Sequence, residues 1–286
     1  MKKIELFLIN ENNQKKRLDS VNNELNKIEK FVNVNKIVAY SKEEAKEQMF
    51  STIEYDAYLN ITEGPFRTDI LPTWGAVACA LSHRKCWEKL VNDNLDYAII
   101  CEDDILITNP DILLFKIFQA TKIMVNCLAD TPTILGNIIP INTSVLINFN
   151  SKVLNSYSVG SNLHRIKSKY TGSHFYILNK YAAIYLKSRI WPILYQIDIE
   201  IGLLHNDFHL YNMDNCGMKT NPSIPSTVQI CDHDSLNVVF PLLPKSIILN
   251  IVKFLPSQYM EYSYGYNSPY THIYNYPTTP YNYFYS

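Results

Sequence analysis

The chain has 286 residues, a formal net charge of −1, 47% hydrophobic residues and 13% aromatic residues. The near-neutral charge argues against a protein that holds nucleic acid or an acidic membrane by electrostatics. The apolar content is sufficient for a large folded core, in one large domain or two small ones.

The N-terminal half alternates strand-like and helix-like patterns. Apolar runs predict strands, and apolar residues repeating every three or four positions predict amphipathic helices. In chain order these are a buried strand at 4–9, a helix over about 18–28, a strand at 37–40, a short helix at 43–49, a helix opened by Gly75, and a strand at 97–101.

The pattern continues with helix-start signals at Asn109-Pro110, Asn179 and Asp198. The region between Asn150 and Tyr170 is polar and carries no clear pattern. The expected elements here are a helix at 111–128, a strand at 133–135, a strand at 175–178, a helix to 187, a helix at 198–205, and a strand at 208–213. This alternation predicts an α/β fold with a mixed, mostly parallel sheet flanked by helices, in which ligands bind at the carboxyl ends of strands.

The domain expectation is one domain over residues 1–256 and a tyrosine-rich, low-complexity tail over 257–286. The tail is expected to wrap the surface or to contact a partner or a second subunit. No apolar run approaches the roughly 20 residues of a membrane span. The first apolar run is short and contains Glu5, which does not fit a signal peptide. The six cysteines show no metal-ligand spacing, so they are expected to be reduced core residues. We therefore expect a cytoplasmic protein, with peripheral association with a membrane left open.

Three consecutive carboxylates, Glu102-Asp103-Asp104, follow the strand at 97–101. Like charges this close repel one another, and a divalent cation with a preference for oxygen ligands, such as Mn²⁺ or Mg²⁺, relieves the repulsion. By themselves they fit equally well a solvated acidic turn, or the metal site of a nuclease, phosphatase or nucleotidyltransferase.

The segments around the triplet narrow this choice. The helix opened by Gly75 begins with the stretch GAVACALSH, which reaches His83; Trp87 lies four residues further on, and the triplet begins nineteen residues after His83. This arrangement resembles glycosyltransferase family 25, the lipooligosaccharide and collagen galactosyltransferase type. Further similar segments are Leu8-Ile9-Asn10 with Arg17, the run 171–177, the run 179–183, Ile197-Asp198, and 225–229 with Ser235. The chain departs from the family pattern at Trp74, at Ala182-Ala183 and at Gln196-Ile197, which leaves the sugar and the acceptor open.

The resemblance implies a GT-A fold, a uridine diphosphate sugar as donor, and inversion at the anomeric carbon. Alternation along the chain favours Asp104 as the first metal ligand and Glu102 as the second. Asp103 is expected to reach the donor ribose or to complete the metal shell. A third ligand is expected from a C-terminal segment, where His233 in the run 232–234 is the best candidate; a polar surface loop is an equally good interpretation.

Five further residues are candidates for binding the donor. Ser82 and His83 belong to the family-like helix, although a helical histidine is more often a packed core residue. Arg17 could pair with phosphate through its guanidinium group or be a solvated helix residue. The remaining two, Asn10 and Tyr40, end neighbouring predicted strands and could contact the base or ribose.

An inverting transfer needs a base that accepts the proton of the acceptor hydroxyl. Asp198 is the candidate, because the family motif has an aspartate there and Ile197 and Ile199 suggest a partly buried environment that raises a carboxyl pKa. It could instead be a helix cap or an acceptor-binding residue, with Glu200 and Asp207 as substitutes for the base.

The predicted function is therefore an inverting glycosyltransferase that uses a divalent metal. Its expected partners are a nucleotide-sugar donor and a glycan, glycolipid or protein acceptor, and nucleic acid is not expected. Two alternatives stay open: a metal-dependent nucleotidyltransferase or phosphoesterase, and an inactive structural module with a glycosyltransferase fold. The low glycine count of 8 disfavours the first alternative, which usually needs a glycine-rich phosphate loop.

Overall fold

The computed structural model describes residues 3–63, 70–129, 143–160 and 162–224, which are organised around an eight-stranded sheet. In sheet order the strands are β2 (Val32–Val38), β1 (Ile4–Asn10), β3 (Tyr97–Glu102), β10 (Phe175–Asn179), β5 (Val145–Phe149), β11 (His209–Met213), β8 (Leu163–Ile166) and β7 (Ser156–Gly160). Two small sheets pair β4 (Ile105–Ile107) with β12 (Met218–Thr220) and β6 (Lys152–Val153) with β9 (Tyr170–Thr171).

Strand direction agrees with the predicted mixed, mostly parallel sheet. β10 is antiparallel to both of its neighbours, and so is β8. The other strands of the large sheet all run in one direction. Because β10 is reversed, its first residue lies at the same sheet edge as the last residue of β3.

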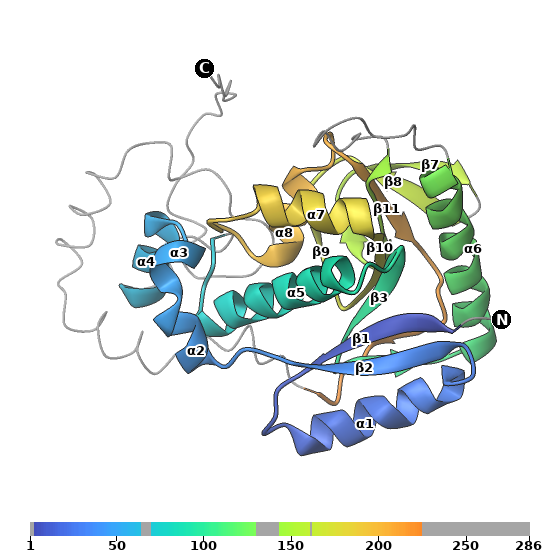
Figure 1. The fold of residues 1–286 in the computed structure, drawn as a ribbon, viewed down its shortest axis with the longest axis horizontal. Coiled ribbons are helices and arrows are strands. Elements are labelled where there is room, and N and C mark those ends of the chain that lie inside the picture. The colour runs from blue at the N-terminus through green and yellow to red at the C-terminus, as the bar shows by residue number, and fades with distance from the viewer. Residues whose placement is uncertain (1–2, 64–69, 130–142, 161, 225–286) are drawn as a thin grey trace, which may run out of the picture.

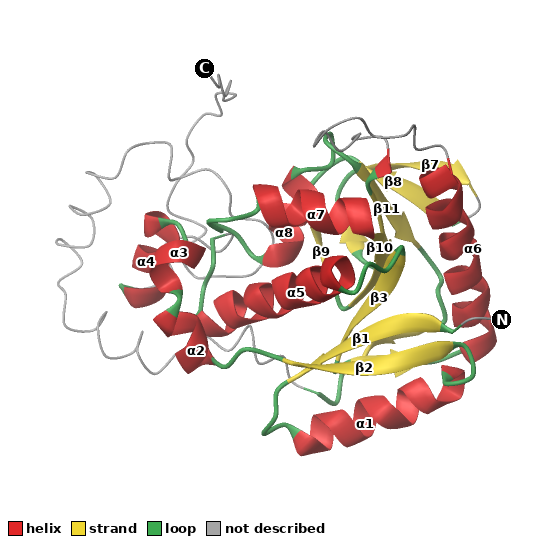
Figure 2. Ribbon diagram, in the orientation of Figure 1, coloured by secondary structure: helices red, strands yellow, loops and turns green. Residues whose placement is uncertain are grey.

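Helices cover both faces of the sheet, as Figures 1 and 2 show. One face carries α5 (Trp74–Asn92), α7 (Lys180–Arg189) and α8 (Ile197–Leu203), with α2 (Lys42–Glu47), α3 (Met49–Thr52) and α4 (Tyr55–Thr62) beyond them. The other face carries α1 (Lys15–Leu25), the short 3₁₀ helix η1 (Asn26–Ile28) and α6 (Pro110–Ala129).

The alternation of strand side chains produces two hydrophobic cores. Along β1, Phe7 and Ile9 belong to the core under α5, whereas Leu6 and Leu8 belong to the core under α1 and α6. All four side chains are buried, so the strand contains apolar residues at consecutive positions. This is why β1 and β3 could be predicted as buried strands.

Several predicted boundaries were wrong. The second strand begins at Val32 rather than Ile37, because β2 is an edge strand whose polar residues face outward. The unpatterned stretch 151–170 contains short strands. Helix α8 begins at Ile197 with Gln196 at its N-cap, so Asp198 lies within the first turn and is not the cap. The predicted strand at 133–135, His233 and the tail lie outside the described residues.

The described cysteines are free thiols, and Cys86, Cys101 and Cys216 are buried. Within the described ranges, no helix has both the length and the apolar character needed to cross a membrane.

Candidate active site

The acidic triplet lies at the sheet edge where β1 and β3 end. Glu102 is the last residue of β3, and Asp103 and Asp104 form the turn that leads to β4. The register of the parallel pair places Ile9 opposite Glu102, so Asn10 at the end of β1 lies beside Asp103. As predicted from alternation along the chain, Glu102 and Asp104 point to one side, where His174 lies. Asp103 points to the other side, toward Asn10 and Arg17.

Glu102 and Asp104 converge on His174, which immediately precedes β10. The Nδ1 atom of His174 lies 3.5 Å from Oε2 of Glu102 and 3.3 Å from Oδ1 of Asp104. The antiparallel pairing of β10 with β3 explains this contact, since the Glu102 amide donates a hydrogen bond to the His174 carbonyl at 2.8 Å. One ligand atom from each of these three residues could therefore coordinate a single ion.

The two carboxylates of this cluster favour positive charge next to them. Burial works against the charged forms of Glu102 and His174. Together, the attraction and hydrogen bonds from His174 and His83 outweigh burial and lower the pKa of Glu102, and those from Glu102 and Asp104 raise the pKa of His174. The buried Oδ1 of Asp104 and Nδ1 of His174 are within ion-pair distance but do not meet the geometry of a hydrogen bond. Two carboxylates and an imidazole fit a divalent ion, and the imidazole nitrogen favours a transition ion over Mg²⁺.

Asp103 faces the opposite way and joins two other predicted donor-binding residues, Asn10 and Arg17, in one network. Its Oδ2 accepts a hydrogen bond from the Asn10 side chain at 2.7 Å. Its Oδ1 pairs with the guanidinium of Arg17, whose Nε lies 2.9 Å away. The network connects the ends of β1 and β3 to the first turns of α1 and places a guanidinium group next to the triplet.

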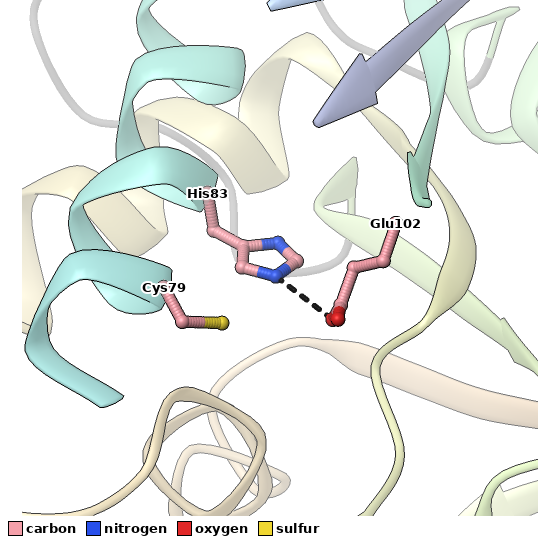
Figure 3. Close-up of side chains that lie close together, drawn as sticks. All are labelled: Cys79, His83 and Glu102. Atoms are coloured by element: carbon pink, nitrogen blue, oxygen red, sulfur yellow. Dashed lines mark hydrogen bonds and ion pairs between the residues drawn. The ribbon is translucent and has the colours of Figure 1, made fainter. Parts of the chain in front are cut away.

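His83 holds Glu102 from the side of α5, as Figure 3 shows. Its completely buried ring lies with Nε2 3.3 Å from Oε1 of Glu102 and Nδ1 2.9 Å from the hydroxyl of Tyr176. That hydroxyl also accepts the indole N–H of Trp87 at 2.9 Å, so its own proton is available for Nδ1. In this arrangement Nε2 carries the imidazole proton and donates it to the Glu102 carboxylate.

Ser82 and Tyr40 use their polar groups within the fold. The Ser82 hydroxyl accepts the Tyr40 backbone N–H at 2.9 Å and donates to the Ala78 carbonyl at 2.7 Å. This fixes the segment after β2 against α5. The Tyr40 ring lies beneath the ammonium group of Lys85, 5.3 Å from the ring centroid.

Asp198 lies beside the acidic cluster. Its Oδ2 accepts the Gly172 N–H and its Oδ1 accepts the Ile199 N–H, each at 2.9 Å. Burial raises the pKa of Asp198, the two N–H donors oppose that shift, and the charges of Glu102 and His174 also act on it. Gly172 has a φ of +96°, a conformation that favours glycine and directs its N–H to Asp198.

The two substitute bases point elsewhere. Oε1 of Glu200 accepts the N–H groups of Leu194 and Tyr195, both at 2.8 Å. Glu200 also lines a separate cavity of about 320 Å³, together with Glu54, Tyr55, Arg189, Leu194 and Tyr195, and none of the acidic triplet lines it. Asp207 interacts with the hydroxyl of Tyr185. Of these three carboxylates, Asp198 is the one brought to the cluster.

His174 was not predicted from the sequence as a site residue. The run 171–177 resembles the family pattern, but no local feature of the sequence indicates a role for its histidine. The available signal was a histidine directly before a strand, which becomes meaningful only once that strand is known to lie antiparallel to β3.

The comparison with known families covers this whole site except the C-terminal segment. The family model described as glycosyltransferase family 25 (LPS biosynthesis protein) matches residues 3–201, more than half of the chain. No curated protein matches the chain. The matched range includes β1, α5, the acidic triplet, His174 and Asp198. The chain therefore belongs to glycosyltransferase family 25.

Proposed function

We propose that this glycosyltransferase moves a sugar, with inversion, from a uridine diphosphate sugar to a hydroxyl group of a glycan, and that it requires Mn²⁺ or Mg²⁺. Family 25 is a GT-A family, and the mixed eight-stranded sheet flanked by helices agrees with that fold. The observation that carries the proposal is the convergence of Glu102, Asp104 and His174 at a strand end, with Asp198 beside them.

Glu102, Asp104 and His174 would hold the metal ion. When bound, the ion supplies positive charge that stabilises the departing diphosphate. His174 takes the place that the sequence suggested for His233 as the third protein ligand. A role for His233, which lies outside the described residues, stays a prediction.

The network around Asp103 would position the donor. Oδ1 of Asn10 is buried and has no hydrogen-bond partner among the described residues, so it can accept a hydrogen bond from uracil N3–H or from a ribose hydroxyl. Arg17 adds positive charge for the diphosphate and is itself held by Asp103. We assign supporting roles to Ser82, Tyr40 and His83, since their polar groups hold α5, the segment after β2, and Glu102.

Asp198 would act as the general base. The acceptor oxygen forms its bond to the anomeric carbon as the bond to the diphosphate breaks, and the hydroxyl proton passes to the Asp198 carboxylate. Each oxygen of that carboxylate accepts one backbone N–H and retains a further lone pair for this proton.

The description of the family as an LPS biosynthesis protein favours the saccharide of a glycolipid as acceptor over a protein. The test is incubation of the full-length protein with a panel of nucleotide sugars and Mn²⁺, with and without a lipopolysaccharide-type saccharide or a peptide acceptor. Release of nucleoside diphosphate should require one donor and increase with the saccharide. Stimulation by the peptide alone would overturn the acceptor assignment.

The metal is tested through donor binding. Asp104→Asn should abolish Mn²⁺-dependent donor binding measured by calorimetry, while Asp93→Asn, at an exposed carboxylate at the end of α5, should leave it unchanged. Donor affinity that is equal with and without a chelator would overturn the metal assignment.

A further inference from the structure

A second group of possible ligands lies next to the first and contains a thiol. Cys79 and His83 are four residues apart on α5, which places both side chains on one face of the helix, and both point toward Glu102 (Figure 3). We propose that Cys79, His83 and Glu102 form a binding site for a thiophilic divalent ion such as Zn²⁺. This site is distinct from the cluster of Glu102, Asp104 and His174 proposed above to hold Mn²⁺ (the Mn²⁺ cluster), but it shares Glu102 with it. The site itself does not depend on the sugar-transfer proposal, whereas its competition with Mn²⁺ rests on the metal assignment proposed above.

The geometry fits a tetrahedral ion. One ligand atom from each residue lies within 4.8 Å of the other two. The Nε2 atom of His83 and the Oε1 atom of Glu102 are 3.3 Å apart. Two ligands bound tetrahedrally at roughly 2.0–2.1 Å are about 3.3–3.4 Å apart, so this pair is already spaced as zinc requires.

The surroundings of His83 support a ligand role. Metal-bound histidines usually donate their second ring N–H to an oxygen that fixes the ring. With an ion on Nε2 the imidazole proton would move to Nδ1, and the Tyr176 hydroxyl, 2.9 Å away, can then accept from both His83 and Trp87. The Tyr176 ring also stacks on the imidazole with centroids 5.6 Å apart, which holds the ring plane.

The two ligand sets differ in chemical softness. Sulfur, nitrogen and oxygen in the Cys79 group select zinc-like ions, whereas the carboxylate-rich Glu102–Asp104–His174 group suits Mn²⁺. Cys79 is a free thiol, and burial together with the neighbouring carboxylates raises its pKa, so binding converts the thiol to a metal thiolate and releases one proton. A cation offsets the same negative charges that favour the protonated thiol.

Glu102 connects the sites, since Oε1 faces His83 and Oε2 faces His174. An ion bound through Oε1 would lie close to an ion bound through Oε2, and two divalent charges this close repel one another. Zn²⁺ should therefore lower the affinity for Mn²⁺.

The experiment titrates the full-length protein with Cd²⁺ and follows the ultraviolet charge-transfer absorption of a cadmium–thiolate bond. We expect absorption for one thiolate, lost in Cys79→Ser and Cys79→Ala but retained in Cys127→Ser, a partly exposed thiol on α6 outside the group. It should also persist in Asp104→Asn, which damages only the Mn²⁺ cluster. Unchanged absorption in folded Cys79→Ser would overturn the proposal, as would unchanged Cd²⁺ affinity in both His83→Gln and Glu102→Gln, since the thiol would then act alone.

Competition provides the second measurement. Bound Mn²⁺, followed by electron paramagnetic resonance, should be displaced from the wild type at a Zn²⁺ concentration at least about tenfold lower than from Cys79→Ser, because loss of a direct ligand should weaken binding at least as much as loss of an outer-shell partner. Equal displacement curves for the wild type and Cys79→Ser would overturn the proposal, because they would show that Zn²⁺ replaces Mn²⁺ within the Mn²⁺ cluster itself. Neither readout needs turnover, so failure here leaves the proposed glycosyltransferase activity untouched.

Discussion

The surroundings of Asp198 favour a role as a base and also make the residue important for stability. Burial raises the pKa of its carboxyl group, which makes it a stronger base than an exposed aspartate. The N–H groups of Gly172 and Ile199 hold its two oxygens in one orientation. The same two donors make the residue sensitive to amide substitution, because an Asn side chain offers only one acceptor oxygen.

Asp198→Asn should therefore lose transfer and some stability together. We expect transfer to fall by roughly 10²–10⁴ from the loss of the base. The free energy of unfolding should fall by about 1–3 kcal/mol, because the amide NH₂ group faces a backbone N–H donor. Donor affinity should persist, measured by calorimetry on protein whose melting temperature is also recorded. Asp207→Asn is the control, and near wild-type transfer by Asp198→Asn would assign Asp198 to positioning alone.

The pH profile of wild-type transfer gives an independent check. A general base works only when unprotonated, so transfer should fall as pH drops through the pKa of Asp198. Since burial raises that pKa, this acidic limb should lie above the ordinary aspartate value of roughly 3.9. Initial rates across pH at saturating metal and donor measure it. The limb should disappear in the residual activity of Asp198→Asn, and a limb that persists there would belong to another group.

His174→Ala should weaken Mn²⁺ binding, because it removes the nitrogen placed between Glu102 and Asp104. We expect the dissociation constant for Mn²⁺ to rise by at least about tenfold, measured by paramagnetic resonance. His164→Ala on β8, beside Asp214, is the control and should not change it. Unchanged affinity in His174→Ala, combined with a loss in His233→Ala, would restore His233 as the third ligand.

Tyr176→Phe should destabilise the protein through its buried hydrogen bonds. The hydroxyl accepts from Trp87 and contacts His83, and its removal leaves the Trp87 N–H without this acceptor in the core. The free energy of unfolding should fall by about 1–3 kcal/mol, measured by urea denaturation. Tyr157→Phe, at a half-exposed ring on β7, should change it little. Equal stability of Tyr176→Phe and the wild type would mean that these hydrogen bonds contribute no net stability.

For single residues, the sequence predicts features that depend on neighbouring positions and does not predict contacts between distant positions. Glu102 and Asp104 could be assigned to one direction and Asp103 to another, because that depends only on alternation along the chain. The pairing of Asp103 with Arg17 and of Glu102 with His174 joins segments that are distant in sequence. No local pattern specifies such pairs.

At the scale of the element, α8 positions Asp198 by packing directly on backbone. A Cβ atom at Gly202 would lie 2.9 Å from the Cα of Lys169 and 3.1 Å from the amide nitrogen of Tyr170. Only glycine allows the helix to approach the segment that enters β9. This close approach keeps Asp198 within reach of Gly172.

Gly202→Ala should therefore displace α8 and impair both stability and transfer. The clash is with backbone atoms, which cannot rotate away, so overpacking of about 1–3 kcal/mol is expected, with transfer reduced more than donor binding. Gly160→Ala is a matched control, because a Cβ there meets nothing within 4 Å. Thermal unfolding and acceptor kinetics measure both effects. A Gly202→Ala variant with wild-type stability would show that α8 tolerates a shift.

Some helices and strands could be predicted from the sequence and others could not. Buried strands such as β1 and β3 and amphipathic helices such as α1 carry strong patterns. The strands β7 and β8 do not, since β7 is exposed along its length and has no alternating apolar face. The reversal of β10 is likewise a property of sheet pairing and is not visible in its own residues.

For the whole molecule, the three-layer arrangement gathers the ends of β1 and β3 and the start of β10 at one sheet edge (Figure 1). The chain beyond the family match still contributes to this edge. β12 pairs with β4, and the Asn221 N–H donates to the Asp104 carbonyl at 2.6 Å. Residues up to about 221 are therefore part of the structure that supports the triplet.

The composition of the tyrosine-rich tail over residues 257–286 predicts no role for it in the catalytic core. Because every site residue described here lies before residue 225, truncation after Pro256 should leave donor hydrolysis and melting temperature close to those of the full chain. A second truncation after Ile224 also removes His233, so the two variants separate the tail from the third-ligand question. If His174 completes the metal cluster, both should bind Mn²⁺ with wild-type affinity. Loss of Mn²⁺ affinity only in the protein that ends at Ile224 would implicate the segment 225–256. A large fall in melting temperature in the protein that ends at Pro256 would show that the tail stabilises the domain.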